Sequence, residues 1–125
     1  MLLDASAWIE FFLDTEKSQY VEDALKANKC FTSVVTIAEI VNWLFRSKTE
    51  DKVHAYLDGI KKGSQILGLS GSISIRAGKL NYERKKAGRK WGMIDSMILA
   101  TAQVYGLKVL TKDNGFRDLP DAEIL

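Results

Sequence analysis

The sequence predicts a three-layer α/β/α protein, with helices on both faces of a mainly parallel sheet of four to five short strands. Short apolar runs alternate along the chain with longer segments of helical periodicity. Strands separated by helices pair in parallel, because the chain must cross back over the sheet between them. The 125 residues contain one proline and no linker rich in glycine, serine or proline. We therefore expect a single domain over residues 1–125.

Five short apolar runs are the expected strands. They are too short to be helices, and polar residues or helical patterns follow them. These runs cover residues 2–3, 30–34, 65–69, 107–110 and 123–125.

The segments between these runs have the apolar spacing of amphipathic helices. Val53, Tyr56 and Ile60, for example, follow one another at intervals of three and four residues. Ser6 is the expected cap of the first helix, and Gly106 is expected to end the last one. The expected helices cover residues 7–12, 17–27, 36–44, 53–62, 72–87 and 94–105.

Composition limits the chemistry that the chain can perform. Eighteen Lys and Arg against sixteen Asp and Glu leave a net charge of +2, which is too small to indicate a partner. One cysteine and one histidine exclude a disulfide framework and clustered thiolate or imidazole metal sites. No apolar run approaches the roughly 20 residues that cross a bilayer, and the N-terminus lacks a basic signal region. We therefore expect a cytoplasmic protein that uses carboxylates and has no membrane partner.

Acidic residues far apart in the sequence are expected at one edge of the sheet. In a parallel sheet, strand C-termini and the N-termini of the following helices meet at the edge where ligands bind. Asp4 and Asp113 follow strands, and Glu39 and Asp95 lie in the first turns of helices. Each acid also has a simpler explanation, because helix dipoles favour acids there and Thr36 with Glu39 matches a capping box.

The set of acids is more informative than its members. Carboxylates gathered in one cleft repel one another and lose hydration unless a cation joins them. Mg²⁺ and Mn²⁺ prefer oxygen ligands, and such ions activate water and polarise phosphates. The pattern therefore indicates metal-dependent hydrolysis.

Four segments resemble the motifs of PIN domains, and at this chain length those of VapC-type toxin ribonucleases. The order and spacing of the segments agree from end to end, although Ser96 stands where many relatives carry a small apolar residue. The segments are LLDASAW at residues 2–8, TIAEIV at 36–41, IDSMILATA at 94–102 and LTKDNGF at 110–116.

The resemblance implies a metal-dependent endoribonuclease. Asp4, Glu39, Asp95 and Asp113 would hold one or two Mg²⁺ or Mn²⁺ ions, and hydrolysis would leave 5′-phosphate and 3′-hydroxyl ends. Asp118 lies close in sequence to Asp113 and is an alternative fourth acid.

Further residues are candidates for roles around these acids. Ser6, Thr111 and Asn114 are candidates for supporting the acids or contacting the substrate. Arg89 and Lys90 are the expected RNA contacts, because they lie in a basic loop that leads to the acidic edge.

The resemblance also implies a VapB-type antitoxin and a homodimer. Aromatic residues in two helices could belong to the core or to a partner surface: Trp8, Phe11, Phe12, Trp43 and Phe45. The alternatives are a PIN-domain RNA-processing nuclease without an antitoxin and a non-catalytic PIN-like scaffold that binds RNA or protein. A phosphatase with an Asp nucleophile is disfavoured because residue 6 is Ser, and a receiver domain is disfavoured because only one acid follows the first strand.

Overall fold

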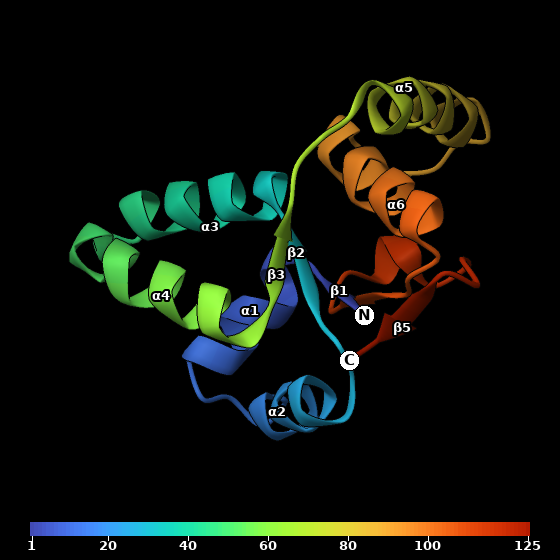
Figure 1. Cartoon of the computed structure of the whole chain (residues 1–125). Coiled ribbons are helices and arrows are strands. Elements are labelled where there is room, and N and C mark those ends of the chain that lie inside the picture. The colour runs from blue at the N-terminus through green and yellow to red at the C-terminus, as the bar shows by residue number, and fades with distance from the viewer.

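Five short strands form one sheet in the order β3-β2-β1-β4-β5, and every neighbouring pair is parallel. This computed structural model covers residues 1–125 and confirms the expected α/β fold (Figure 1). The strands are β1 (Leu2–Leu3), β2 (Phe31–Ser33), β3 (Gln65–Leu67), β4 (Val109–Thr111) and β5 (Ala122–Ile124).

Helices cover both faces of this sheet. Figure 1 shows α5 and α6 together on one side of the strands, with α1, α2 and α4 on the other side. No helix is both long enough and apolar enough to cross a membrane. The helices are α1 (Ala5–Phe12), α2 (Ser18–Ala27), α3 (Val34–Arg46), α4 (Val53–Gly63), α5 (Gly71–Lys86) and α6 (Met93–Tyr105), with short 3₁₀ turns η1 (Glu50–Lys52) and η2 (Asn114–Phe116).

The two residues of β1 divide the hydrophobic core between the two faces of the sheet. Successive side chains of a strand point to opposite faces. Leu2 packs with Val109 in the cluster that includes α6, whereas Leu3 packs with Leu110 in the cluster that includes α1 and α2. All four side chains are fully buried, so the central strands are apolar on both faces.

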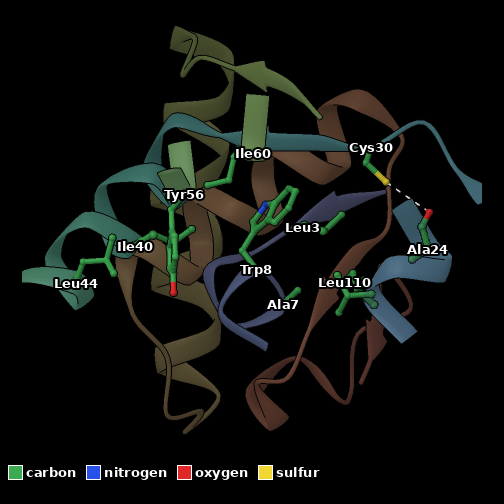
Figure 2. Packing of buried hydrophobic residues seen from close by; sticks show 11 residues of the cluster. Leu3, Ala7, Trp8, Ala24, Cys30, Ile40, Leu44, Tyr56, Ile60 and Leu110 are labelled. Carbon is green, nitrogen blue, oxygen red and sulfur yellow. Dashed lines mark hydrogen bonds between the residues drawn. The ribbon is translucent and has the colours of Figure 1, made fainter. Parts of the chain in front are cut away.

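Trp8 lies in the middle of the cluster that includes α1 and α2 (Figure 2). Its side chain is fully buried and stacks on Phe12, with 5.6 Å between the ring centroids. Its indole Nε1 donates a hydrogen bond of 3.0 Å to the Thr32 hydroxyl of β2. Trp8 is therefore a core residue, whereas Phe45 of the same aromatic set is 59% exposed and remains available to a partner.

Two expected helix starts are wrong because other side chains cap these helices. Asp4, rather than Ser6, caps α1 by accepting a hydrogen bond of 3.0 Å from the amide of Ala7. Ser33 caps α3 by accepting one of 3.1 Å from Val35, so this helix begins two residues before Thr36. The expected Thr36-x-x-Glu39 capping box is therefore absent, and Glu39 has no capping role.

The expected strands and helices are also shifted at several ends. The expected strand over 30–34 is shortened by one residue at each end to β2, since Val34 is already the first residue of α3, and the strand over 65–69 ends two residues early. The expected strand over 107–110 starts late, because residues 107–108 first leave the left-handed turn at Gly106. β5 ends one residue earlier than expected, and α5 begins one residue earlier because Ser70 caps it.

Replacing Trp8 should be the most damaging aromatic truncation in the chain. Trp8→Ala removes a fully buried ring and should lower the free energy of unfolding by about 3–5 kcal/mol. Trp43→Ala is the matched control and should cost less, because Trp43 only packs on the edge of the same cluster. Urea denaturation measures both values, and an equal loss for the two variants would contradict the central place given to Trp8.

Candidate active site

The strand order brings the four acids to one edge of the sheet. β1 lies between β2 and β4, so the segments that follow these three strands are neighbours. Asp4 follows β1 and Asp113 lies two residues after β4, whereas Glu39 lies in the second turn of α3, the helix that follows β2. Asp95 lies in the first turn of α6. The residues therefore converge from four elements, as expected at the C-terminal edge of a parallel sheet.

Asp4 is buried and held in place by its own helix. Its Oδ1 accepts hydrogen bonds from the amide of Ala7 at 3.0 Å and from the hydroxyl of Ser6 at 2.7 Å. Burial raises the pKa of Asp4, and the charge of Asp113 adds to this increase. The hydroxyls of Thr111 and Ser6 and the Ala7 amide act in the opposite direction, because they stabilise the carboxylate form.

Glu39 has a strongly perturbed carboxyl group. Its pKa is raised from 4.5 to about 7, first by burial and then by the charges of Asp4, Asp95 and Asp113. The three aspartates are therefore near enough to repel an ionised Glu39. A perturbed acid among like charges is typical of a functional site.

Asp95 and Asp113 are each oriented by a backbone amide. Gly92 donates to Asp95 Oδ2 at 3.1 Å, and Gly115 donates to Asp113 Oδ1 at 2.8 Å. Burial raises the pKa of Asp95, and Asp113 raises it further, whereas the Gly92 amide and the Arg84 charge lower it. Both aspartates thus have one oxygen engaged by the protein.

Ser6 and Thr111 connect the two strand-end acids. The Ser6 hydroxyl lies 3.3 Å from that of Thr111 and also accepts a hydrogen bond of 2.8 Å from the Lys112 amide. The Thr111 hydroxyl in turn accepts a hydrogen bond of 2.9 Å from the Asp113 amide. Asn114 does not join this network, because its side chain is bonded to Arg117 at 2.7 Å.

Asp118 belongs to a different group of side chains. It accepts two hydrogen bonds of 3.0 Å from Arg84 and forms an ion pair of 3.2 Å with Arg89. The Arg84 hydrogen bonds are the main reason that the pKa of Asp118 is lowered. The structure thus brings Asp113, and not Asp118, among the three other acids.

The two expected RNA contacts, Arg89 and Lys90, differ in solvent exposure and in ion pairing. Lys90 is exposed, whereas Arg89 is half-exposed and already paired with Asp118. Sequence reasoning assigned no role to Arg84. One signal in the sequence indicates that Arg84 faces inward. Arg84 lies four residues after Leu80 on the same helix, and Leu80 packs on the core.

The donor set fits a hard divalent cation. It contains only oxygen ligands whose mutual repulsion a cation would relieve. Thr36, three residues before Glu39 and on the same helix face, has a buried hydroxyl without a hydrogen-bond partner, as expected of a group that serves a ligand. In this conformation, no group of three or more His, Cys, Asp or Glu side chains lies close enough together to hold an ion directly. An ion would therefore be bound through water or after the carboxylates turn towards it.

Comparison with known families identifies the family of the chain. A family model described as PIN domain matches residues 1–122, so the chain belongs to the PIN domain family. The chain is 24% identical over 116 residues to ribonuclease VapC4 of Mycobacterium tuberculosis, covering 91% of this chain and 89% of that protein.

Solved structures have the same fold. The chain is similar to VapBC2 from Rickettsia felis bound to a promoter DNA fragment, with a TM-score of 0.81, 19% identity and coverage of 99% and 97% of the two chains. It is also similar to Mycobacterium tuberculosis VapC20, a toxin that cleaves the sarcin-ricin loop, with a TM-score of 0.74, 13% identity and coverage of 95% and 94%.

The Glu39 pKa predicts a pH dependence of stability. The folded value of about 7 lies above the ordinary value of 4.5, so the metal-free folded state binds this proton more tightly than the unfolded state. The free energy of unfolding should therefore fall as pH rises from about 4.5 to about 7, and then level off. Glu39→Gln should remove about 1–2 kcal/mol of this decrease, since partial exposure screens part of the shift.

Urea denaturation at a series of pH values, with chelator present, measures this difference. The titrating groups away from Glu39 are common to the two proteins, so their contribution cancels, and the difference reports Glu39 together with its coupling to the three aspartates. Parallel stability curves for the two proteins would show that Glu39 does not titrate in this range.

Proposed function

We propose that the chain is an endoribonuclease that depends on Mg²⁺ or Mn²⁺ and is the toxin of a toxin–antitoxin pair. The observation that carries the proposal is the convergence of four acids from four elements, three of which raise the pKa of the fourth. Similarity to ribonuclease VapC4 supports RNA as the substrate. Similarity to VapBC complexes supports a VapB-type antitoxin as the partner.

Asp4, Glu39, Asp95 and Asp113 are the proposed ligands of the ion. When bound, Mg²⁺ or Mn²⁺ would activate water and neutralise charge on the phosphodiester. The hydroxyl of Ser6 and the amides of Gly92 and Gly115 orient the aspartates before any ion arrives. Glu39 releases its proton near neutral pH and then becomes able to serve as a ligand.

The RNA backbone is proposed to contact the basic loop that precedes Asp95. Lys90 is exposed there, and Arg89 keeps half of its side chain in solvent while paired with Asp118. Cations beside an acidic centre would hold the phosphates that the carboxylates repel. We place Lys90 as a stronger RNA contact than Arg89. Lys90 forms no ion pair, whereas Arg89 would have to give up its ion pair with Asp118.

Glu39→Gln should show whether Glu39 is a metal ligand or a purely structural residue. Metal at 100 times its dissociation constant should raise the free energy of unfolding of the wild-type chain by about 2.7 kcal/mol. The Gln variant should lose most of this gain in stability. Its rate of RNA cleavage should fall by about 100-fold or more, because a negative ligand is gone. Without metal it should be no less stable than wild type, because one like charge has left the cluster.

Calorimetry with and without Mg²⁺ or Mn²⁺, and a cleavage assay on structured and unstructured RNA, measure these effects. Glu50→Gln is the matched control, since Glu50 is an exposed acid of η1 outside the site. A Glu39→Gln variant that cuts at the wild-type rate would remove Glu39 from the site. A wild-type chain that gains no stability from metal would favour the non-catalytic scaffold.

The proposed partners predict an assembly and an inhibitor. In the cytoplasm the chain should form a homodimer, and a VapB-type antitoxin should place an Arg or Lys side chain at the acidic edge. A peptide from such an antitoxin should then weaken Mn²⁺ binding by competing for the same carboxylates. Light scattering should give twice the mass of one chain, and calorimetry should detect the competition. A monomer that no antitoxin inhibits would indicate an RNA-processing nuclease instead.

A further inference from the structure

Arg84 in the last turn of α5 is a cation that turns into the protein. Its side chain is only 11% exposed, whereas the neighbouring Lys85 and Lys86 are exposed. A buried arginine requires partners for its charge and for its donors. Those partners come from two separate segments that flank the acidic edge.

The guanidinium group binds these segments with its face and its edge at once. Its central carbon lies 4.1 Å from the centroid of the Trp91 ring, in the loop before α6. Its two terminal nitrogens donate to the two oxygens of Asp118 at 3.0 Å each, and one of them also donates to the Gly115 carbonyl at 2.9 Å. A lysine cannot reproduce this combination, because its ammonium group has neither the planar face nor the fork.

One of these segments orients Asp113. The carbonyl of Gly115 accepts from Arg84, and the amide of the same residue donates to Asp113 Oδ1 at 2.8 Å. Arg84 therefore holds the residue that holds the carboxylate. Phe116, the next residue, packs on Trp91 with 4.8 Å between ring centroids, so the two segments also contact each other directly.

The other segment orients Asp95. Trp91 Nε1 donates to the Ser96 hydroxyl at 2.6 Å, and Ser96 directly follows Asp95. Gly92, the residue after Trp91, donates its amide to Asp95 Oδ2 at 3.1 Å. Trp91 is thus attached to the first turn of α6 twice, through its ring to Ser96 and through the amide of the next residue to Asp95.

We propose that Arg84 is a positioning residue that sets the separation between Asp95 and Asp113 by holding the Gly115–Asp118 segment against Trp91. The inference rests on the proposed metal site, because that site uses both aspartates. Arg84 makes no hydrogen bond to either of these carboxylates, so it positions them through Gly115 and Trp91, and the direct effect of its charge on Asp95 is a separate one that a lysine would keep. Without the Arg84 contacts, the turn after β4 can move relative to α6, and the distance between the Asp95 and Asp113 carboxylates is no longer fixed.

Arg84→Lys tests this role because it keeps the positive charge and removes the fork and the stacking. The Mn²⁺ dissociation constant, measured by titration calorimetry on the folded protein, should rise about tenfold or more. In the metal-free protein the Gly115 amide should exchange its hydrogen faster. RNA cleavage should recover at saturating Mn²⁺, because all four proposed ligands remain, and a merely structural defect would not be repaired in this way.

Arg76→Lys is the matched control on the same helix. Arg76 also reaches α6, through a hydrogen bond of 3.2 Å to Gln103, but neither residue joins the contacts around Asp95 and Asp113. Its Mn²⁺ dissociation constant and its Gly115 exchange should equal those of the wild type. An increase of similar size in both variants would overturn the specific role of Arg84.

Asp118→Asn keeps the test decisive if the lysine variant does not fold. Asp118 is at the surface, and its replacement weakens the same contact while leaving the Arg84 bond to Gly115. It should still raise the Mn²⁺ dissociation constant above that of the wild type, and where Arg84→Lys folds, by less than that variant does. Unchanged Mn²⁺ binding in the folded variants would overturn the positioning role and leave the proposed function intact. Failure of the wild type itself to bind Mn²⁺ would instead overturn the proposed function, and this inference with it.

Discussion

The arrangement of the molecule depends on the pairing of β1 between β2 and β4. This strand has two residues, both fully buried, and each points to a different face of the sheet. Apolar burial on both faces anchors the strand, and parallel pairing on both sides gives it one direction. Asp4 must then leave the sheet at the same edge as the chain that follows β2 and β4. The acidic edge is thus a consequence of how a very short strand is held.

Gathering carboxylates at this edge opposes folding, and local hydrogen bonds offset part of the effect. Burial and mutual repulsion raise the pKa values of Asp4, Glu39 and Asp95. Asp4 receives donors from Ala7 and Ser6, and Asp95 receives one from Gly92. Glu39 receives no hydrogen bond that would lower its pKa, which rises to about 7. A cation at this edge would therefore relieve the unfavourable surroundings of the Glu39 carboxylate.

The segment after β4 is held from two sides. On one side the Ser6 hydroxyl accepts from the Lys112 amide, and the Lys112 ammonium pairs with the buried carboxylate of Glu10 in α1. This pairing is the main reason that the pKa of Glu10 is lowered. On the other side Arg84 binds Gly115 from α5. Asp113 lies between these two attachments, so both sheet faces contribute to its position.

The sequence by itself determined the order of the elements and the edge at which the acids gather. Short apolar runs and helical spacing distinguish strands from helices, and the geometry of parallel sheets places Asp4, Glu39, Asp95 and Asp113 at one edge without any knowledge of contacts. Helix starts were harder to predict, because Ser33 and Thr36 are equally good caps in sequence and only the end of strand pairing selects Ser33.

Only the tertiary structure decided which neighbouring acid joins the group and which arginine faces inward. Asp113 and Asp118 are five residues apart in one acidic, glycine-containing segment, and no local pattern separates them. Their roles depend on Arg84, which lies more than thirty positions earlier than Asp118 and binds that acid on the far side of the turn. Sequence periodicity reports the face of an element that is buried. It does not report which charges meet, because ion pairs between distant segments form only after the helices have packed.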